Sequence, residues 1–307
     1  MGRIEDAIEI MAIRLNSNPN QTLNTVVNII KKLKCHINRQ QVLSCDERYD
    51  LVDQLSYYVY VQPICLPLKQ KIGFTRAVRY SETSGCTYSN VSRLSYIPIG
   101  SEIPVSKGRI NESGESLFYA SLLSNNNSVL TALAECRSSE GETFNILFSE
   151  TCPNTYGYLT LQPLGLNDYF RRGVPDPFYT DTKDRELYKK FLSAICPEGK
   201  IAMQLCDAFM VDVLTSPGSD TLYDVSSAIG KKYLSAPFDG LIYPSTKYAG
   251  HPNVALKPSS VDQKLQHIST QSVLVDEKYD YGIYQLSQRA KGKVDSVGAI
   301  VWDAVKS

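Results

Sequence analysis

The sequence predicts an α+β fold with a helical segment at its N-terminus. Residues 4–58 repeat apolar side chains with helical periodicity. From about Ile72 onward the chain instead contains short aromatic and β-branched runs separated by polar turns, a pattern typical of strands. Helices and strands then follow one another without the regular alternation that a doubly wound parallel sheet requires, which favours α+β over that class.

The N-terminal segment, residues 1–66, is expected to contain three helices. Apolar residues fall on one helical face over 4–15 and again over 23–33, with Pro19 between the two stripes. The second stripe consists of Leu23, Val26, Val27, Ile30 and Leu33.

A third helix is indicated by a capping signal. Ser44 and Glu47 have the spacing of a capping box, in which each side chain bonds the backbone N–H of the other residue. An apolar stripe continues to Tyr58, and Pro63 and Pro67 then mark the end of the segment.

The remainder of the chain, 67–307, is expected to form the mixed α and β core. Helices are predicted over 126–136, 184–195, 201–214 and 225–233. Strands are predicted in eight runs: 73–80, 93–99, 116–121, 143–150, 156–165, 240–245, 272–288 and 298–303.

Composition and charge exclude several classes of protein. The formal net charge is +0, so no overall field attracts nucleic acid or an anionic membrane, and neither is an expected partner. No apolar run approaches the roughly 20 residues of a membrane span, and the first residues are acidic where a signal peptide needs an apolar core. The eight cysteines form no CxxC pair and the three histidines are scattered, so no metal site is expected. These features predict reduced thiols in a cytoplasmic protein.

Absent motifs narrow the chemistry further. The chain has no GxGxxG after a strand, no GxxxxGK[ST] and no GxSxG. Dehydrogenase, P-loop ATPase and α/β-hydrolase functions are therefore not indicated.

Four residues form the candidate site. Arg109 lies in a glycine-containing turn and could grip phosphate oxygens, and Tyr119 ends an apolar run, where its ring or hydroxyl could orient a nucleotide. Glu135 lies on a helix and could stabilise positive charge on a ribose carbon, while Ser245 follows Pro244 where a strand ends. Taken singly, each has an ordinary structural explanation, such as a surface ion pair, a core tyrosine, a solvated carboxylate or a turn cap.

Taken together and in this order, the four residues resemble the RES domain, a family named for its Arg, Glu and Ser. The resemblance covers about 72–258 and rests on four motifs: Gly108-Arg109-Ile110-Asn111, Leu117-Phe118-Tyr119-Ala120, Ala132-Leu133-Ala134-Glu135 and Asp239-Gly240-Leu241-Ile242-Tyr243-Pro244-Ser245. It implies a mixed β core with surrounding helices, like that of ADP-ribosyltransferase toxins, over 67–307.

The resemblance also implies a function. RES proteins are mostly toxins of toxin–antitoxin pairs; they break the nicotinamide–ribose bond of NAD+ by hydrolysis or phosphorolysis, and some transfer ADP-ribose to a protein. It makes Arg109, Tyr119, Glu135 and Ser245 the catalytic residues, and we expect Arg76 and Asn111 to be weaker substrate-binding candidates. The implied partners are NAD+ as substrate, inorganic phosphate and an Xre-like antitoxin, and a homo-oligomer is compatible with the family.

Three hypotheses remain open from the sequence. The first is a toxin-like enzyme that depletes free NAD+, acting as a glycohydrolase or a phosphorylase. The second uses the same site to transfer ADP-ribose onto a protein. The third is a catalytically silent interaction protein that keeps the fold.

Overall fold

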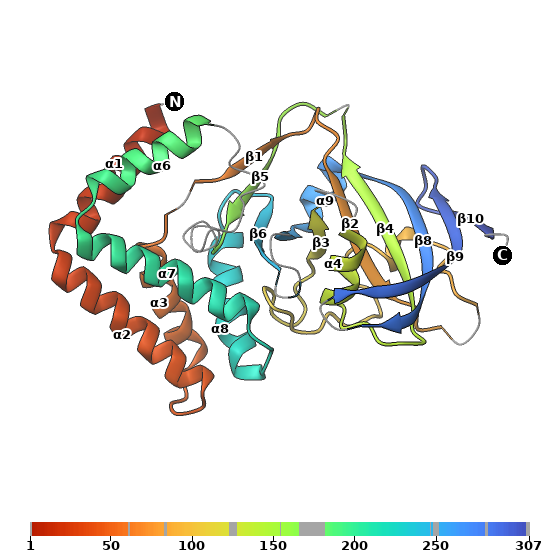
Figure 1. The fold of residues 1–307 in the computed structure, drawn as a ribbon, viewed down its shortest axis with the longest axis horizontal. Coiled ribbons are helices and arrows are strands. Elements are labelled where there is room, and N and C mark those ends of the chain that lie inside the picture. The colour runs from red at the N-terminus through yellow and green to blue at the C-terminus, as the bar shows by residue number, and fades with distance from the viewer. Residues whose placement is uncertain are drawn as a thin grey trace. The chain divides into compact units, whose positions relative to one another are not determined.

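The structure is a computed structural model, and it confirms the α+β class. Eight α-helices and a ten-stranded sheet lie within the residues that it describes (Figure 1). Those residues are 2–60, 62–82, 85–122, 128–153, 155–165, 182–245, 247, 252–279 and 282–304.

The chain forms two compact units that interleave along the sequence. The helical unit comprises Met1–Ile64, Lys107–Glu112 and Gln162–Phe238. The sheet unit comprises Cys65–Ser106, Ser113–Leu161 and Asp239–Ser307. The N-terminal helices thus pack with two later segments of the chain into one unit. The predicted domain division into 1–66 and 67–307 stays a prediction.

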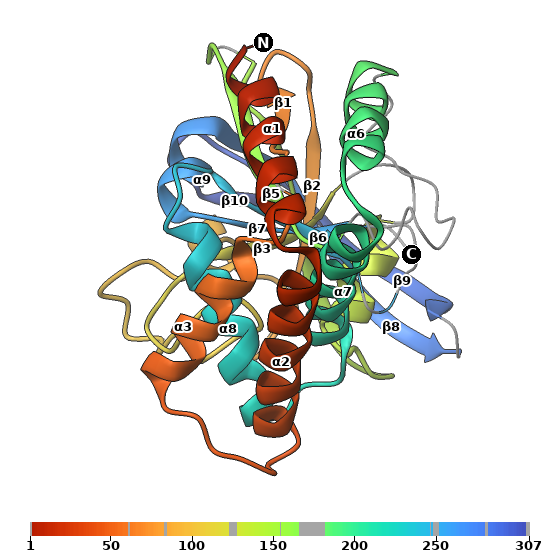
Figure 2. The same cartoon turned by 90° about the vertical axis from the view of Figure 1, so that its left-hand side faces the viewer.

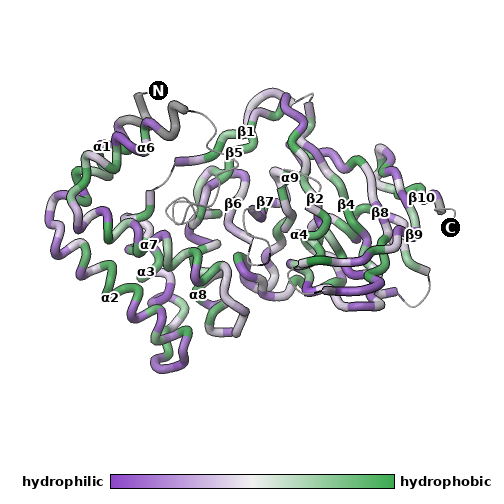
Figure 3. The backbone as a smooth tube through the Cα atoms, in the orientation of Figure 1, coloured by the Kyte–Doolittle hydropathy of each residue, from purple (hydrophilic) through white to green (hydrophobic). Residues whose placement is uncertain are grey.

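Six helices make up most of the described part of the helical unit. They are α1 (Gly2–Ser17), α2 (Pro19–Ile37), α3 (Cys45–Ser56), α6 (Thr182–Ala194), α7 (Pro197–Thr215) and α8 (Asp220–Leu234). Helix α2 packs along α7, and α3 packs along α8 (Figure 2). Hydrophobic and hydrophilic residues interleave along these helices, as amphipathic helices require (Figure 3).

Helix α2 shows where the predicted stripe was right and where it was wrong. Val26 and Leu33 are fully buried as expected, whereas Val27 is 45% exposed. The buried face instead continues through Thr22, Ile29 and His36. Two polar residues thus take inward positions that an apolar pattern does not reveal.

The start of α3 is confirmed in detail. The Ser44 hydroxyl accepts a hydrogen bond from the Glu47 N–H at 3.2 Å, and the Glu47 carboxylate accepts one from the Ser44 N–H at 2.7 Å. This capping box satisfies two backbone donors that the first turn of a helix leaves unpaired. Hydrogen bonds to the Glu47 carboxylate from the Ser44 backbone N–H and from the Ser44 side chain lower the pKa of this carboxyl.

The sheet contains ten strands in the order β1-β5-β6-β7-β3-β2-β4-β8-β9-β10, and every neighbouring pair from β6 to β10 is antiparallel. The strands are β1 (Ile64–Pro67), β2 (Gly73–Arg79), β3 (Phe118–Leu122), β4 (Thr143–Thr151), β5 (Tyr158–Pro163), β6 (Gly240–Pro244), β7 (Pro252–Leu256), β8 (Leu265–Lys278), β9 (Tyr284–Val294) and β10 (Ile300–Ala304). Two helices accompany them, α4 (Ser128–Glu135) and α9 (Pro258–Lys264).

One predicted strand is wrong. The run 93–99 forms no strand; a short 3-10 helix, η1 (Val91–Arg93), leads into it. The Asn90 side chain accepts a hydrogen bond from the Ser92 N–H and starts the turn, and Pro98 lacks the N–H that a strand ladder needs. The apolar character of the run reflects burial of Leu94, which is 0% exposed, rather than strand pairing.

One hydrophobic cluster of the sheet unit lies between α4 and strands β2, β4 and β8. Its buried residues are Ala77, Ala132, Leu133, Phe144, Ile146, Val273 and Val275. Helix α4 is therefore held against the sheet by apolar contacts, and this fixes the position of its last residue, Glu135.

Two further features concern the whole chain. All eight cysteines are free thiols. Within the ranges that the structure describes, no helix is both long enough and apolar enough to cross a lipid bilayer.

Candidate functional site

A polar row crosses the sheet at the level of Ser121. The strand register places Ser121 directly opposite Thr75 on β2 and Asn253 on β7, and Asn253 directly opposite Tyr243 on β6. Residues that pair directly across strands share one face of a sheet, so these four side chains lie on the same face. All four are buried, with exposed fractions of 0–5%.

Tyr119 belongs to the same face, one row along. It lies two residues before Ser121 on β3, and alternate residues of a strand point to the same side. Its cross-strand partner is Ala255, a small residue that leaves room for the ring. The Tyr119 side chain is half-buried.

Glu135 meets this row from the C-terminal end of α4. Its Oε1 accepts hydrogen bonds from the Ser245 hydroxyl at 2.6 Å and from the Asn253 side-chain N–H at 2.9 Å. Ser128 and Thr131, which share the polar side of α4, are also buried, and the Ser128 hydroxyl bonds Thr75 at 3.0 Å. Both sides of α4 are thus packed, which the apolar stripe alone did not indicate.

The neighbouring thiol is a poor nucleophile. Cys136 directly follows Glu135, and its sulfur donates to the Ala77 carbonyl at 3.2 Å. Burial raises the pKa of the Cys136 thiol, so the reactive thiolate is disfavoured. The carboxylate is therefore the stronger candidate for chemistry at this end of α4.

The Asp-Gly pair fixes the start of β6, the strand that ends directly before Ser245. The Asp239 carboxylate accepts hydrogen bonds from the Thr160 N–H, the Ser260 hydroxyl and the Lys264 ammonium at 2.7–2.8 Å. A Cβ at Gly240 would lie 2.3 Å from the Ala255 carbonyl oxygen, so only glycine permits this close approach of β6 to β7. The Asp-Gly part of the sequence motif is explained by these structural contacts.

Arg76 lies where the pairing of β2 with β3 stops. The ladder covers only Phe74 and Thr75 on β2, after which the Arg76 guanidinium donates to the carbonyls of Tyr119 at 2.8 Å and Leu94 at 3.0 Å. Burial lowers the pKa of Arg76, and the nearby Cys136 and Tyr119 act in the opposite direction. Arg76 thus brings a cation close to Tyr119.

Arg109 belongs to the helical unit. Its guanidinium donates to the carbonyls of Ser216 at 3.1 Å and Val213 at 3.4 Å, and it lies 5.9 Å from the centre of the Tyr223 ring. The carbonyls of the last helical turn lack partners within the helix and carry partial negative charge, so a cation is favoured there. In this structure Arg109 caps the C-terminal end of α7.

The turn that carries Arg109 is fixed to α8. The Gly108 N–H donates to the Asn111 carbonyl at 3.1 Å and closes the turn. A Cβ at Gly230 on α8 would lie 2.0 Å from the Ile110 carbonyl oxygen, so the absence of a side chain there lets the turn pack against the helix. Asn111 is buried, and its side-chain N–H donates to the Glu112 carbonyl at 2.9 Å.

A cluster of charged residues bonds both ends of the Lys107–Glu112 segment to α8. The Lys107 ammonium contacts Asp224 at 2.5 Å and Glu112 at 3.1 Å, and the Ser227 hydroxyl donates to Glu112 at 2.5 Å. His36 Nε2 lies 3.4 Å from Asp224. The segment Lys107–Glu112 is therefore an integral part of the helical unit.

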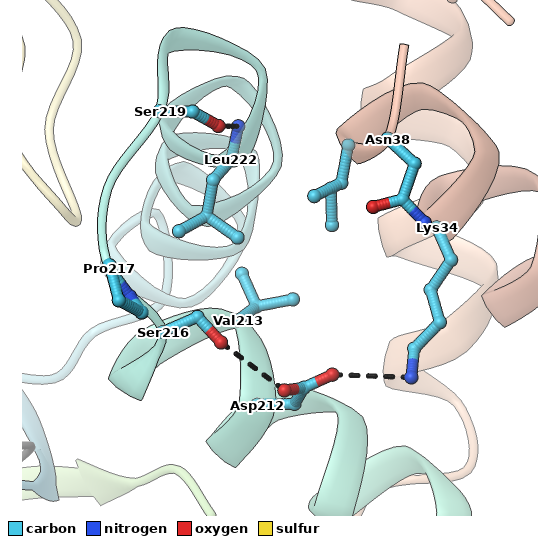
Figure 4. Close-up of a pocket in the computed structure, with 9 residues that line it drawn as sticks. Lys34, Asn38, Asp212, Val213, Ser216, Pro217, Ser219 and Leu222 are labelled. Carbon is cyan, nitrogen blue, oxygen red and sulfur yellow. Dashed lines mark hydrogen bonds and ion pairs between the residues drawn. The ribbon is translucent and has the colours of Figure 1, made fainter. Parts of the chain in front are cut away.

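A pocket of about 300 Å³ lies in the helical unit at the ends of α2 and α7 (Figure 4). Lys34 and Asp212 form an ion pair of 3.2 Å in its lining, and the two residues whose carbonyls accept from Arg109 also line it. The complete lining is Lys34, Ile37, Asn38, Asp212, Val213, Ser216, Pro217, Ser219 and Leu222. None of the six candidate residues lines this pocket.

The structure brings together part of the predicted set. Glu135 and Ser245 are in direct contact, Tyr119 lies on the same face of β3 as Ser121, and Arg76 bonds the Tyr119 backbone. Arg109 and Asn111 belong to the helical unit. Within the described part of the chain, no group of three or more His, Cys, Asp or Glu residues is arranged to hold a metal ion.

Sequence reasoning includes Asn253-Val254-Ala255-Leu256 in the RES resemblance as a closing strand, but it assigns neither Asn253 nor Ser121 to the site. Each occurs in a buried strand, where asparagine in particular is unusual. A polar residue inside an otherwise apolar strand was the available signal. Their contact with each other depends on strand register, which the sequence does not reveal.

Comparison with known proteins adds no family assignment. No family model matches the chain, and no curated protein matches it.

Proposed function

We propose that this protein is an enzyme that cleaves the nicotinamide–ribose bond of NAD+, with Glu135 as the central catalytic residue. One observation supports the proposal most directly: the Glu135 carboxylate meets Ser245 and Asn253, residues distant in sequence, through hydrogen bonds of 2.6 and 2.9 Å. Three of the four predicted catalytic residues occur on this face. Their order along the chain is the one on which the RES resemblance rests.

The chemistry of the bond explains the need for a fixed carboxylate. As nicotinamide leaves, positive charge develops on the ribose carbon, and the transition state is oxocarbenium-like. A preorganised negative group stabilises such a charge without reorganising during the reaction. Glu135 supplies that charge, and Tyr119 orients the ribose.

Two acceptors, water or inorganic phosphate, can complete the reaction. The bonding pair leaves with nicotinamide, which becomes neutral. Water then adds to the ribose carbon, giving ADP-ribose and a proton, or inorganic phosphate adds to it, giving a phosphorylated ADP-ribose. No metal takes part in this proposal.

The cations have separate proposed roles. By resemblance, Arg109 and Ser245 are each proposed as phosphate ligands. The Arg109 guanidinium now donates to two backbone carbonyls, so phosphate binding requires it to exchange these bonds or to use its other N–H groups. Arg76, whose guanidinium donates to the Tyr119 carbonyl at 2.8 Å, is proposed as a secondary phosphate ligand.

The test is nicotinamide release from NAD+ by purified protein, with and without inorganic phosphate. We expect wild type to release nicotinamide and Glu135→Gln to be slower by about a hundredfold, the typical effect of losing one electrostatic contact to a transition state. Glu150→Gln is the matched control, because Glu150 is a half-buried carboxylate of the same unit that bonds Gln266 at 2.7 Å. It should keep the wild-type rate.

The products distinguish the alternatives. Free ADP-ribose indicates hydrolysis, the phosphorylated product indicates phosphorolysis, and ADP-ribose bound to protein indicates transfer. A wild-type protein that leaves NAD+ intact in the presence of phosphate and host-cell protein would contradict the proposal. So would an unchanged rate in Glu135→Gln.

A further inference from the structure

We infer that Asn253 is a positioning residue that holds Glu135 in place for bond cleavage. The inference rests on the proposed function, and it assigns a role to a residue outside the predicted catalytic set. Asn253 touches the catalytic carboxylate, and its proposed action is on that carboxylate rather than on NAD+. Three features of its surroundings support this role.

The first feature is a chain of hydrogen bonds that fixes both ends of the amide. A carboxylate only accepts hydrogen bonds, so the Asn253 side-chain N–H donates to Glu135 Oε1, at 2.9 Å. The Ser121 hydroxyl donates to the Asn253 carbonyl oxygen, at 3.1 Å. A flipped amide would place its carbonyl oxygen against the Glu135 carboxylate, which has no proton to donate, so the bond to Glu135 would be lost.

The second feature is the location of Asn253 in the middle of the sheet. It lies on β7 between Ser121 on β3 and Tyr243 on β6, and it is 5% exposed. A strand paired on both sides moves little, so its side chain is a rigid support. A buried amide is costly unless its donors and acceptor are bonded, which makes a chance asparagine at this position expensive in stability.

The third feature is the location of Glu135 at the end of α4. This helix has only eight residues, and Glu135 is the last of them. Hydrogen bonds from the Arg137 N–H to the Ala134 carbonyl at 3.1 Å and from the Ser138 N–H to the Leu133 carbonyl at 3.3 Å close this end of the helix, but they fix only its backbone and leave the direction of the Glu135 side chain open. The two donors on Glu135 Oε1 come from the β6–β7 region: Ser245 directly follows β6, and Asn253 lies within β7. The carboxylate is therefore oriented by the sheet rather than by its own helix.

The experiment compares Asn253→Ala and Asn253→Asp with wild type in kcat and KM for NAD+. A bond to a charged group contributes about 1.5–3 kcal/mol, so we expect kcat to fall about ten- to hundredfold. KM should change less than about twofold, because positioning of the carboxylate acts mainly on the transition state. Asn253→Asp should fall at least as far as Asn253→Ala, since it places a like charge beside Glu135.

Asn145→Asp is the matched control. Asn145 is also a buried strand asparagine of the sheet unit, but it bonds the Tyr88 N–H and the Cys86 carbonyl. Its substitution should lower the urea midpoint of unfolding and leave kcat per folded molecule unchanged. If Asn253→Ala does not fold, Ser121→Ala removes the support at the other end of the amide and should still lower kcat.

A double-mutant cycle separates positioning from a general structural effect. If Asn253 acts through Glu135, adding Asn253→Ala to Glu135→Gln should change the residual rate by less than about twofold. The same cycle, measured by urea unfolding, should show that the two substitutions are not additive. Additive effects in both readouts, or a wild-type kcat in Asn253→Ala, would overturn the inference.

Failure of the proposed function has a different signature. A wild type that releases no nicotinamide contradicts NAD+ cleavage and removes the catalytic meaning of the Asn253 inference. The unfolding cycle still reports whether Asn253 holds Glu135, because it does not depend on turnover. If the unfolding cycle shows coupling between Asn253 and Glu135 but wild type does not turn over NAD+, the proposed reaction is wrong. If wild type turns over NAD+ but the two residues are not coupled, the role proposed for Asn253 is wrong.

Discussion

At the residue scale, the candidate site depends on one carboxylate and the donors around it. The Ser245 hydroxyl is the shortest contact of Glu135 among those described here, at 2.6 Å, and it also accepts the Lys247 N–H at 3.2 Å. Ser245 therefore links the end of β6 to the end of α4. Its buried location, at 3% exposure, makes it a supporting donor as well as a candidate phosphate ligand.

We expect Ser245→Ala to lower kcat about tenfold, because one charge-assisted hydrogen bond to Glu135 is lost. KM for NAD+ should rise as well if Ser245 also contacts the phosphates. The measurement is steady-state nicotinamide release. Ser272→Ala is the control, since Ser272 is a buried serine of β8 that bonds the Cys86 carbonyl at 2.7 Å. Equal rates in wild type and Ser245→Ala would remove Ser245 from the site.

His267 gives the fold a defined dependence on pH. Burial lowers the pKa of His267 from 6.5 to about 4, partly opposed by Asp262. The unfolded chain therefore binds this proton more readily than the folded chain between those values. Neutral His267 therefore makes its full contribution to the stability of the folded state above about pH 6.5, and this contribution is lost as the pH falls toward 4.

Unfolding by urea at pH 7 and pH 4.5 tests this dependence. We expect the free energy of unfolding to fall over that range, by up to about 3 kcal/mol from this group. His267→Gln keeps a polar group beside Ser149, whose hydroxyl bonds His267 at 2.8 Å, and should flatten the dependence. An equally steep dependence in His267→Gln would assign it to other groups.

At the element scale, glycines determine how closely segments approach one another. Gly230 lies inside α8, where helix propensity alone predicts that alanine stabilises the protein by about 1 kcal/mol. The Ile110 carbonyl oxygen, however, occupies the space that a Cβ would need, at 2.0 Å. We expect Gly230→Ala to destabilise the protein by about 1–3 kcal/mol, the usual cost of overpacking.

The urea midpoint of unfolding decides the sign of this effect. Gly199→Ala in α7 is the matched control, because its Cβ would meet its nearest neighbours at 3.1–3.2 Å, a contact that a small shift relieves. It should be close to neutral. A Gly230→Ala protein more stable than wild type would show that the Lys107–Glu112 segment is not held against α8.

The elements with strong local signals were predictable from the sequence. The Ser44–Glu47 capping box located the start of α3, and short aromatic and β-branched runs between polar turns located β2 and β4. Register and tertiary context were not predictable. The run 93–99 has the apolar character of a strand although it is Leu94 that is buried and no strand forms. The contact of Asn253 with Ser121 follows from the pairing of β7 with β3, which the sequence does not reveal.

At the scale of the whole molecule, the candidate residues divide between the two compact units. Tyr119, Glu135 and Ser245 belong to the sheet unit, and Arg109 belongs to the helical unit together with its carbonyl partners. The sequence predicted the set from motif order alone. Motif order carries no information on which unit holds each residue, so this division became visible only in the structure.

The proposed toxin activity has a consequence for the host cell. We expect expression of wild type to lower cellular NAD+ and to arrest growth, and Arg109→Ala to relieve both effects. Arg79→Ala is the control, because Arg79 is an exposed arginine that pairs with Glu142. Growth and cellular NAD+ are measured side by side. An Xre-like antitoxin is the partner proposed to restore growth when it is expressed with the wild type.

The most direct measurement is nicotinamide release at saturating NAD+ by wild type, Glu135→Gln and Glu150→Gln under the same conditions. NAD+ cleavage centred on Glu135 predicts turnover by wild type and by Glu150→Gln, and a loss of about a hundredfold in Glu135→Gln. A wild type without turnover, or a Glu135→Gln protein that matches it, would contradict the assignment of Glu135 as the catalytic carboxylate.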